Sequence, residues 1–222
     1  MDIISMVAEA VAFITAFIIV ITICKRDISY IGNKLFVISF LLYGIYALFL
    51  FIYEFPISIL VNTILLQSSL SLIVLGTLIF VLSMQIFYAG RIYLKRNITK
   101  ILIIISIIIC ILTFFFPYEV YQLVPSIEAY KNIVSLLATG IWAYILMIYN
   151  SISLFRILRN MDKSKKRLKR NITVLTSAQL IALLSPTMSV IGNIIENNLI
   201  HALMFVFLAI PLVLVGYTIL RK

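Results

Sequence analysis

Charged residues are scarce in this chain, because Asp, Glu, Lys and Arg make up only 12% of its 222 residues. Soluble proteins carry about 25%. Hydrophobic residues account for 64%, and the mean hydropathy is +1.18. A soluble globule has no means of burying so large an apolar fraction. The composition therefore predicts an integral membrane protein.

Residues that carry catalytic and metal chemistry are scarce as well. Cys24 and Cys110 form no CxxC pair and resemble apolar fillers. His201 is the only histidine, so there is no HExxH motif and no nearby Ser that it would activate. No Asp lies inside an apolar run, which excludes a pair of intramembrane aspartates. We therefore expect neither an enzyme nor a metal or cofactor site.

Seven apolar runs are long enough to cross a bilayer, since about 20 helical residues span its hydrocarbon core. They predict an all-α, seven-helix membrane bundle that forms one domain over residues 1–222. The spans are predicted at residues 3–24, 35–53, 57–88, 101–116, 132–155, 172–195 and 199–220. The third run corresponds to about 48 Å of helix, so we expect a single tilted helix that extends beyond the bilayer.

Basic residues fall on one side of this predicted bundle. Every one of the 18 Lys and Arg residues except Lys131 lies on the side opposite the N-terminus. More than half of residues 156–170 are Lys or Arg. Because such residues are retained in the cytoplasm, we expect an outside N-terminus and a cytoplasmic C-terminus in the cell membrane. The net charge of +10 then indicates contact with membrane lipid and not with nucleic acid.

Polar residues within the spans are predicted to share one depth. They are costly in hydrocarbon and are expected to face the interior of the bundle. Several sit about one to two helical turns from the end predicted to face outward. The predicted ligand-binding residues are Glu9, Tyr46, Gln67, Thr139, Trp142, Ser189 and Asn193. They predict an outward-opening pocket in which Glu9 is the one buried acid.

Two simpler roles for these polar residues stay open. Small polar residues can join neighbouring helices without binding a ligand, at ~0.6 kcal/mol for each hydrogen bond. Glu9, which lies close to the N-terminus, could equally sit at the membrane interface with its carboxylate in water.

Pro186 and the basic residues of 156–170 predict how ligand binding in such a pocket would be transmitted to the cytoplasm. Pro186 removes a helical hydrogen bond from the span 172–195 and is the candidate hinge. The candidate partner-binding residues are Lys165, Lys166, Arg167, Lys169 and Arg170. Their charge suits an acidic cytoplasmic signalling protein, and the alternative is that they only anchor the chain to lipid headgroups.

Three stretches carry a resemblance to a known family. They are residues 33–54 (NKLFVISFLLYGIYALFLFIYE), residues 66–93 with their AGRIY ending, and KSKKRLKR at 163–170, which runs into a span with Pro186 and Asn193. Together they resemble the seven-helix sensory region at the N-terminus of some histidine kinases. The resemblance implies a receptor-like sensor in signal transduction. No phosphoacceptor helix or ATP-binding domain follows Lys222, so we expect the sensory part alone, signalling through a partner.

Other seven-helix classes fit less well. Retinal attachment needs a Lys in the seventh span, and residues 199–220 contain none. A small transporter built as three helices, a linker helix and three helices shares the expected number of spans and orientation. Sugar-efflux transporters of that kind carry a Pro in the first span of each repeat, which spans 3–24 and 132–155 lack. A transporter, or a scaffold subunit of a membrane complex, remains the alternative function.

Overall fold

The computed structural model describes residues 3–26, 28–124, 126–161, 166–195 and 198–220. These residues are mostly helical. The helices are α1 (Ile3–Arg26), α2 (Ile31–Tyr53), α3 (Ile59–Ala89), α4 (Asn97–Phe115), α5 (Ile133–Arg159), α6 (Lys166–Ala182), α7 (Leu184–Ile195) and α8 (Asn198–Leu220). A 3-10 helix, η1 (Arg91–Lys95), follows α3, and two short strands, β1 (Glu119–Gln122) and β2 (Glu128–Tyr130), lie between α4 and α5.

The helical bundle predicted by hydropathy is confirmed. In the part of the chain that the structure describes, six helical stretches are long and apolar enough to cross a membrane. One of these, residues 169–192, runs through α6 into α7, and the apolar part of α8, residues 203–218, is shorter. The third run forms the single long helix that was expected, the 31 residues of α3. A total of seven spans stays a prediction.

Local signals set several helix ends. Ser58 caps α3, because its hydroxyl accepts a hydrogen bond from the backbone N–H of Val61 at 3.2 Å. Asn132 caps α5 in the same way through Val134, at 3.0 Å. The helix α3 ends at Gly90, whose φ of 73° is readily adopted only by glycine.

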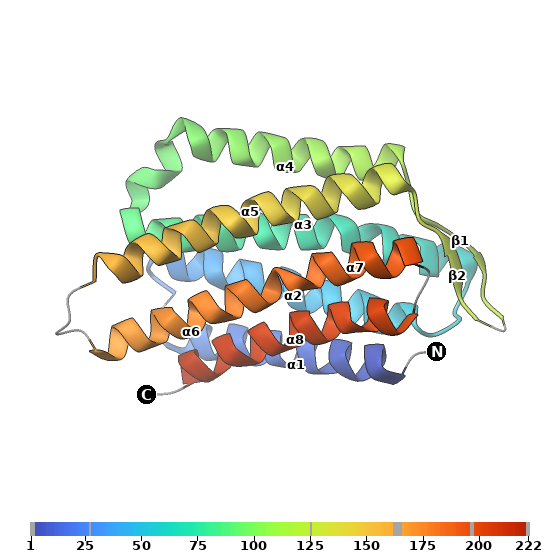
Figure 1. Cartoon of the computed structure of the whole chain (residues 1–222), viewed down its shortest axis with the longest axis horizontal. Coiled ribbons are helices and arrows are strands. Elements are labelled where there is room, and N and C mark those ends of the chain that lie inside the picture. Colours follow the sequence, from blue (N-terminus) through green and yellow to red (C-terminus); the bar gives the residue numbers. More distant parts are fainter. Residues whose placement is uncertain (1–2, 27, 125, 162–165, 196–197, 221–222) are drawn as a thin grey trace.

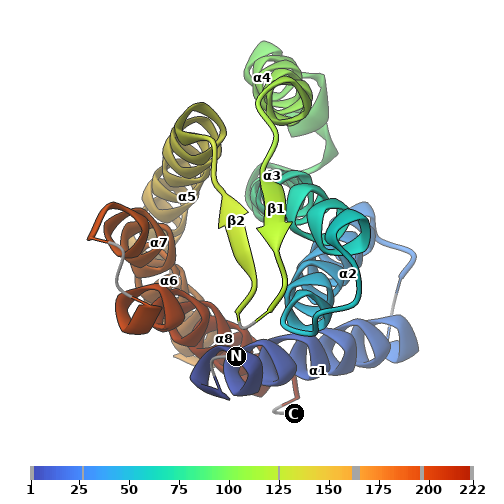
Figure 2. The same cartoon turned by 90° about the vertical axis from the view of Figure 1, so that its right-hand side faces the viewer.

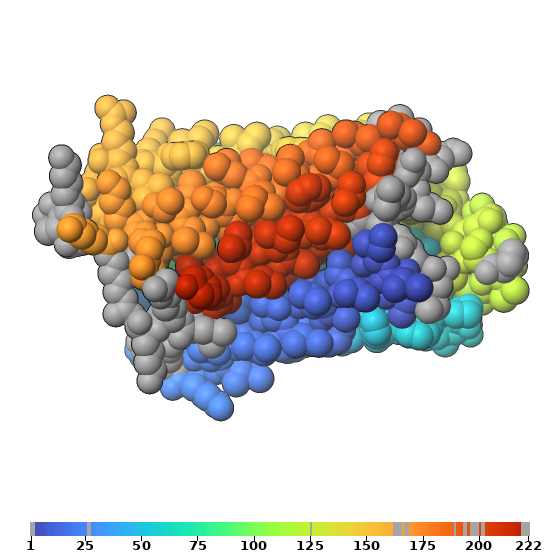
Figure 3. Space-filling model, turned by 60° about the horizontal axis from the view of Figure 1, so that its bottom comes forward, coloured from blue at the N-terminus to red at the C-terminus, as the bar shows by residue number. Residues whose placement is uncertain are grey.

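The helices enclose a central axis. Going around it, α1 packs on α2, α2 on α3, α3 on α5, α5 on α6 and α7, and these on α8, which returns to α1. Figure 2 shows this ring end-on, and Figure 1 shows that α1 begins near the β-hairpin and that α8 ends at the opposite end of the bundle. Figure 3 shows the face on which α6, α7, α8 and α1 lie side by side. The centre of the ring is therefore lined by all of these helices.

Helix α4 lies outside the ring, against α3 and α5 (Figure 2). Its buried residues are Thr99, Leu102, Ser106 and Thr113. Apart from the buried Leu102, many of its large apolar side chains, such as Ile104, are exposed. A helix with small, polar residues towards its neighbours and large, apolar residues outward suits a lipid environment.

Small residues bring α2 and α3 close together. The Ser39 hydroxyl donates to the Gly76 carbonyl at 2.8 Å, and the Tyr43 hydroxyl donates to Thr77 Oγ1 at 3.1 Å. A Cβ atom on Gly76 would come within 3.2 Å of the Tyr43 ring, so this contact requires glycine or a shift of the ring. These residues join helices, which is the alternative role for buried polar groups in this type of bundle.

The span predicted at 172–195 is divided into two helices. α6 ends at Ala182 and α7 begins at Leu184, so Pro186 lies in the first turn of α7. Proline has no N–H to donate to the carbonyl four residues earlier, that of Ala182. The sequence predicted a kink in one helix, and the structure shows the helical stretch 169–192 interrupted at a single residue, Leu183.

The segment between α4 and α5, which lies between the predicted spans 101–116 and 132–155, forms a β-hairpin. Strands β1 and β2 pair antiparallel, with Val120 opposite Ala129 and an irregularity between Val120 and Gln122. Figure 2 shows the hairpin lying across the middle of the ring at one end of the bundle. We refer to this as the hairpin end.

Candidate ligand-binding site at the hairpin end

A cavity of about 160 Å³ lies inside the ring at the hairpin end. Every helix of the ring except α6 contributes to its wall: Glu9 from α1, Tyr46 from α2, Leu66 from α3, Thr139 from α5, Pro186 from α7 and Phe205 from α8. Tyr118, the residue that precedes strand β1 of the hairpin, lines it too. The cavity is thus central to the bundle and is not a crevice between two helices.

The wall formed by α5 gives the length of the cavity. Leu136, Thr139, Gly140, Ala143 and Met147 all line it, at intervals that place them on one face of the helix. At 1.5 Å per residue, the stripe from Leu136 to Met147 covers about 16 Å. The cavity therefore extends well into the bundle.

Glu9, Tyr46 and Tyr118 are the largest polar side chains buried in the wall. Glu9 is 1% exposed, Tyr46 is 7% exposed and Tyr118 is 3% exposed. Tyr46 lies within electrostatic range of both Glu9 and Tyr118. The hydroxyl of Tyr118 has no hydrogen-bond partner among the described residues. Because buried polar atoms are almost always hydrogen-bonded, a hydroxyl without a protein partner is expected to bond to a ligand or a water molecule.

The hydroxyl groups of Thr139 and Ser69 in the wall are already satisfied by their own helices. The Thr139 hydroxyl donates to the Ser135 carbonyl at 2.6 Å, and the Ser69 hydroxyl donates to the Leu66 carbonyl at 2.7 Å. These bonds leave lone pairs on the hydroxyl oxygens, but no hydrogen to donate to a ligand.

Two opposite charges lie near the mouth of the cavity. Glu54 follows α2 and Lys131 precedes α5, and both are half-buried in the cavity lining. Burial lowers the pKa of Lys131, and the nearby charge of Glu54 opposes this shift. The two side chains therefore interact with each other at the hairpin end.

The hairpin is held in place by polar groups of α3. The backbone N–H of Tyr118 donates to Gln67 Oε1 at 2.9 Å, and that of Val120 donates to Thr63 Oγ1 at 3.0 Å. The other end of the Gln67 amide donates to the Thr113 carbonyl of α4 at 2.5 Å. Gln67, predicted to bind ligand, instead lies outside the cavity and connects α3 to α4 and the hairpin.

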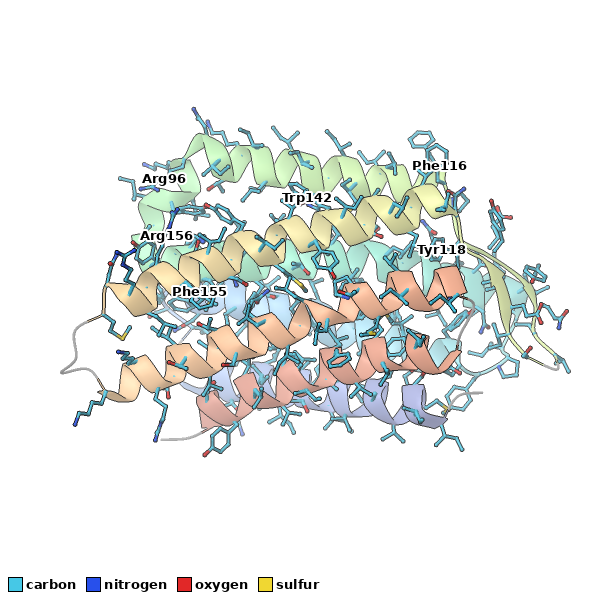
Figure 4. The ribbon with its side chains drawn as sticks, in the orientation of Figure 1. Arg96, Phe116, Tyr118, Trp142, Phe155 and Arg156 are labelled. Atoms are coloured by element: carbon cyan, nitrogen blue, oxygen red, sulfur yellow. The ribbon has the colours of Figure 1, made fainter. Side chains whose placement is uncertain are left out.

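Trp142 also lies outside the cavity. Its indole N–H donates to Ser106 Oγ of α4 at 2.8 Å, and Figure 4 shows it between α4 and α5. Its helix presents one face to the cavity and another to α4, and Trp142 is on the second. This placement differs from the sequence prediction because helical spacing does not reveal that α4 packs outside the ring.

The predicted site residues are therefore only partly brought together. Glu9, Tyr46, Thr139 and the candidate hinge Pro186 meet at the cavity. For Ser189 and Asn193 the backbone lies in α7, and their side chains lie outside what the structure describes.

The described candidate partner-binding residues lie at the other end of the bundle, where α6 begins (Figure 1). Lys166, Lys169 and Arg170 belong to the start of α6 and are exposed. Lys165 and the Arg167 side chain lie outside the described part of the chain.

Sequence reasoning missed Tyr118, Glu54 and Lys131 as lining residues. A signal for Tyr118 was present, because Tyr118 and Val120 alternate with the exposed Glu119 as they would in a half-buried strand. Among the described residues, no three His, Cys, Asp or Glu side chains lie together as metal ligands would. The cavity thus offers charge and hydrogen bonds, within mostly apolar walls.

Neither protein-family models nor curated proteins match this chain. The resemblance to kinase sensory regions therefore stays a hypothesis, and function has to be argued from the cavity.

A first prediction concerns the anchor of the hairpin. Gln67→Leu removes the acceptor of the Tyr118 N–H and the donor to Thr113, and we expect a stability loss of about 1–3 kcal/mol. We also expect faster proteolysis within the hairpin. Thermal unfolding and limited proteolysis in detergent measure both effects. Ser71→Ala is the control, since its hydroxyl only approaches Thr113 Oγ1 at 3.5 Å. Equal melting and cleavage in the two variants would show that Gln67 does not hold the hairpin.

Proposed function

We propose that this chain is a seven-span membrane sensor, in which a ligand in the hairpin-end cavity shifts the basic segment 156–170. The bias of Lys and Arg supports an orientation with the hairpin outside and the basic segment in the cytoplasm. In that orientation the cavity faces the exterior. The described parts of the basic segment, at the end of α5 and the start of α6, lie at the far end of the bundle (Figure 1).

The observation that carries this proposal is the break between α6 and α7. Pro186 and Val190 of α7 line the cavity, whereas the exposed Lys166, Lys169 and Arg170 belong to the start of α6. A helix interrupted at this point has a low cost of bending. The α6–α7 helix would then populate two bend angles. A ligand that binds one of them more tightly would shift the population towards that bend angle. The basic residues would then present a changed surface to an acidic partner protein or to anionic lipid headgroups.

The proposal can be tested without knowing the ligand, by filling the cavity with a side chain. Ala143→Phe adds a ring to the wall next to α7. With spin labels on Arg159→Cys and Arg170→Cys, at the cytoplasmic ends of α5 and α6, we expect the label distance to change by about 1–2 Å. Pulsed electron paramagnetic resonance in nanodiscs measures it.

Ile141→Phe is the matched control, because Ile141 is on the same helix but 57% exposed. Cys24 and Cys110 are replaced by Ala in all variants, since both are free thiols. A change in Ala143→Phe that is absent in Ile141→Phe supports the coupling. Identical label distances in a folded Ala143→Phe protein would contradict it.

One observation favours transport as a second candidate function. A smaller cavity of about 50 Å³, lined by Gln179 and Pro211, shares Met147 and Leu208 with the larger one. The two cavities thus meet at Met147 and Leu208, as an interrupted path would. Solute accumulation in proteoliposomes, compared with protein-free vesicles, distinguishes transport from sensing.

A further inference from the structure

The wall of the hairpin-end cavity carries acceptors that suit a positively charged group. Glu9 supplies a carboxylate, and Tyr118 supplies a hydroxyl oxygen without a partner. Tyr46 is close to both and contributes an aromatic ring. An ammonium group donates hydrogen bonds to carboxylate and hydroxyl oxygens and is attracted to the face of an aromatic ring.

The charge of the wall favours the same class of ligand. Glu9, Glu54 and Lys131 are its charged residues, so two carboxylates stand against one ammonium group when all three are ionised. Lys131 interacts with Glu54 near the mouth. Glu9 comes from a different helix, α1, and lies within electrostatic range of Tyr46. An anionic ligand would meet repulsion here, whereas a cation would be attracted.

Size and apolarity limit the cation further. The cavity of about 160 Å³ is comparable to one of ~150 Å³ that holds a benzene molecule. Leu66, Ile73, Met204 and Leu208 are among the apolar residues around it. A hydrated metal ion gains little from such walls, and an organic body about the size of one ring fills them.

We propose that the cavity binds a small organic ammonium ion, with a body of about one ring, whose N–H groups donate to Glu9 and to the Tyr118 hydroxyl. This inference rests on the cavity being the ligand site of the proposed sensor. It adds the chemical class of the ligand and assigns the hairpin, through Tyr118, a direct part in binding.

Three probes of nearly equal size and different charge test the proposal: benzylammonium, benzyl alcohol and benzoate. A ligand that binds only the folded state raises the melting temperature, and the gain in stability follows RT ln(1 + L/Kd), where L is the free ligand concentration. We expect benzylammonium to stabilise the purified full chain in detergent and to bind at least about tenfold more tightly than benzyl alcohol. Benzoate should not bind. Isothermal titration calorimetry gives the dissociation constants.

Single-residue variants test which side chains contact the bound ammonium ion. Glu9→Gln should weaken benzylammonium binding about 10- to 100-fold and bring it close to that of benzyl alcohol. Tyr118→Phe should weaken it about threefold to tenfold. Glu119→Gln, an exposed acid of β1 outside the cavity, is the matched control and should bind as the wild type does. Ala143→Phe should abolish binding. This result would distinguish binding in the cavity from partition of the probe into detergent.

Different results would overturn the ammonium ligand and the proposed sensor function. Equal or tighter binding of benzyl alcohol or benzoate, undiminished binding by Glu9→Gln, or no stabilisation by benzylammonium would overturn the ammonium ligand. The comparison of probes on the wild type remains decisive if Glu9→Gln fails to fold. The label distances in Ala143→Phe need no ligand, so their failure overturns the sensor while the binding results stand on their own.

Discussion

Gln122→Cys should react with an impermeant maleimide in intact cells, and Ser164→Cys should not. Gln122 lies in strand β1 of the hairpin, and Ser164 belongs to the basic segment, outside the described residues. Retention of Lys and Arg on the cytoplasmic side predicts that these two positions lie on opposite sides of the membrane. The expected difference is close to all or none, which makes it the largest effect predicted for this protein.

The labelling needs a background free of other reactive thiols. Cys24 is exposed and Cys110 is partly buried, so both are replaced by Ala. Permeabilised cells supply the control, since both introduced cysteines should react there. Labelling of Ser164→Cys in intact cells, alone or together with Gln122→Cys, would refute the orientation. The cavity would then open to the cytoplasm, and the sensor would face the wrong compartment.

Pro186→Ala should stabilise the protein and at the same time abolish the coupling between the hairpin-end cavity and the basic segment. Alanine restores the N–H that the Ala182 carbonyl lacks as a partner when residue 186 is proline. α6 and α7 can then join into one helix through Leu183. We expect a gain of about 1–3 kcal/mol, which corresponds to a rise in melting temperature of roughly 2–12 °C for a chain of this size.

The loss of coupling is the second part of this prediction. A continuous helix is stiffer than a broken one, so the change in label distance caused by Ala143→Phe should disappear when Pro186→Ala is added. Pro211→Ala is the matched control, because Pro211 lies inside α8 and does not line the hairpin-end cavity. It should also raise the melting temperature but leave the distance change intact. A distance change that survives Pro186→Ala would remove the hinge from the mechanism.

Features that depend on residues close together in the chain were predictable. The apolar run from 57 to 88 predicted one long helix, and α3 occupies 59–89. Pro186 indicated where the helix 172–195 would be disturbed, because the missing N–H is a property of the residue itself. The depth of Glu9, Tyr46 and Thr139 was predictable too, since depth follows from counting residues along a helix.

Features that depend on which helices are neighbours were not predictable in this way. Thr63 and Gln67 share a face of α3, as their spacing requires, but that face meets the hairpin and α4. Trp142 faces α4 for the same reason. The order of helices around the ring follows from the packing of all of them together, and a single periodic pattern carries no information about it.

Hydropathy and charge, summed over long stretches, suffice to predict a helical membrane protein and the side on which its basic segment lies. These are averages, and the transfer of each apolar or charged residue contributes almost independently to them. The cavity is different. Its existence depends on α4 packing outside the ring, on the hairpin docking through Gln67 and Thr63, and on Tyr118 turning inward. Each of these is a contact between segments far apart in the chain, and only the folded structure brings their side chains within hydrogen-bonding distance.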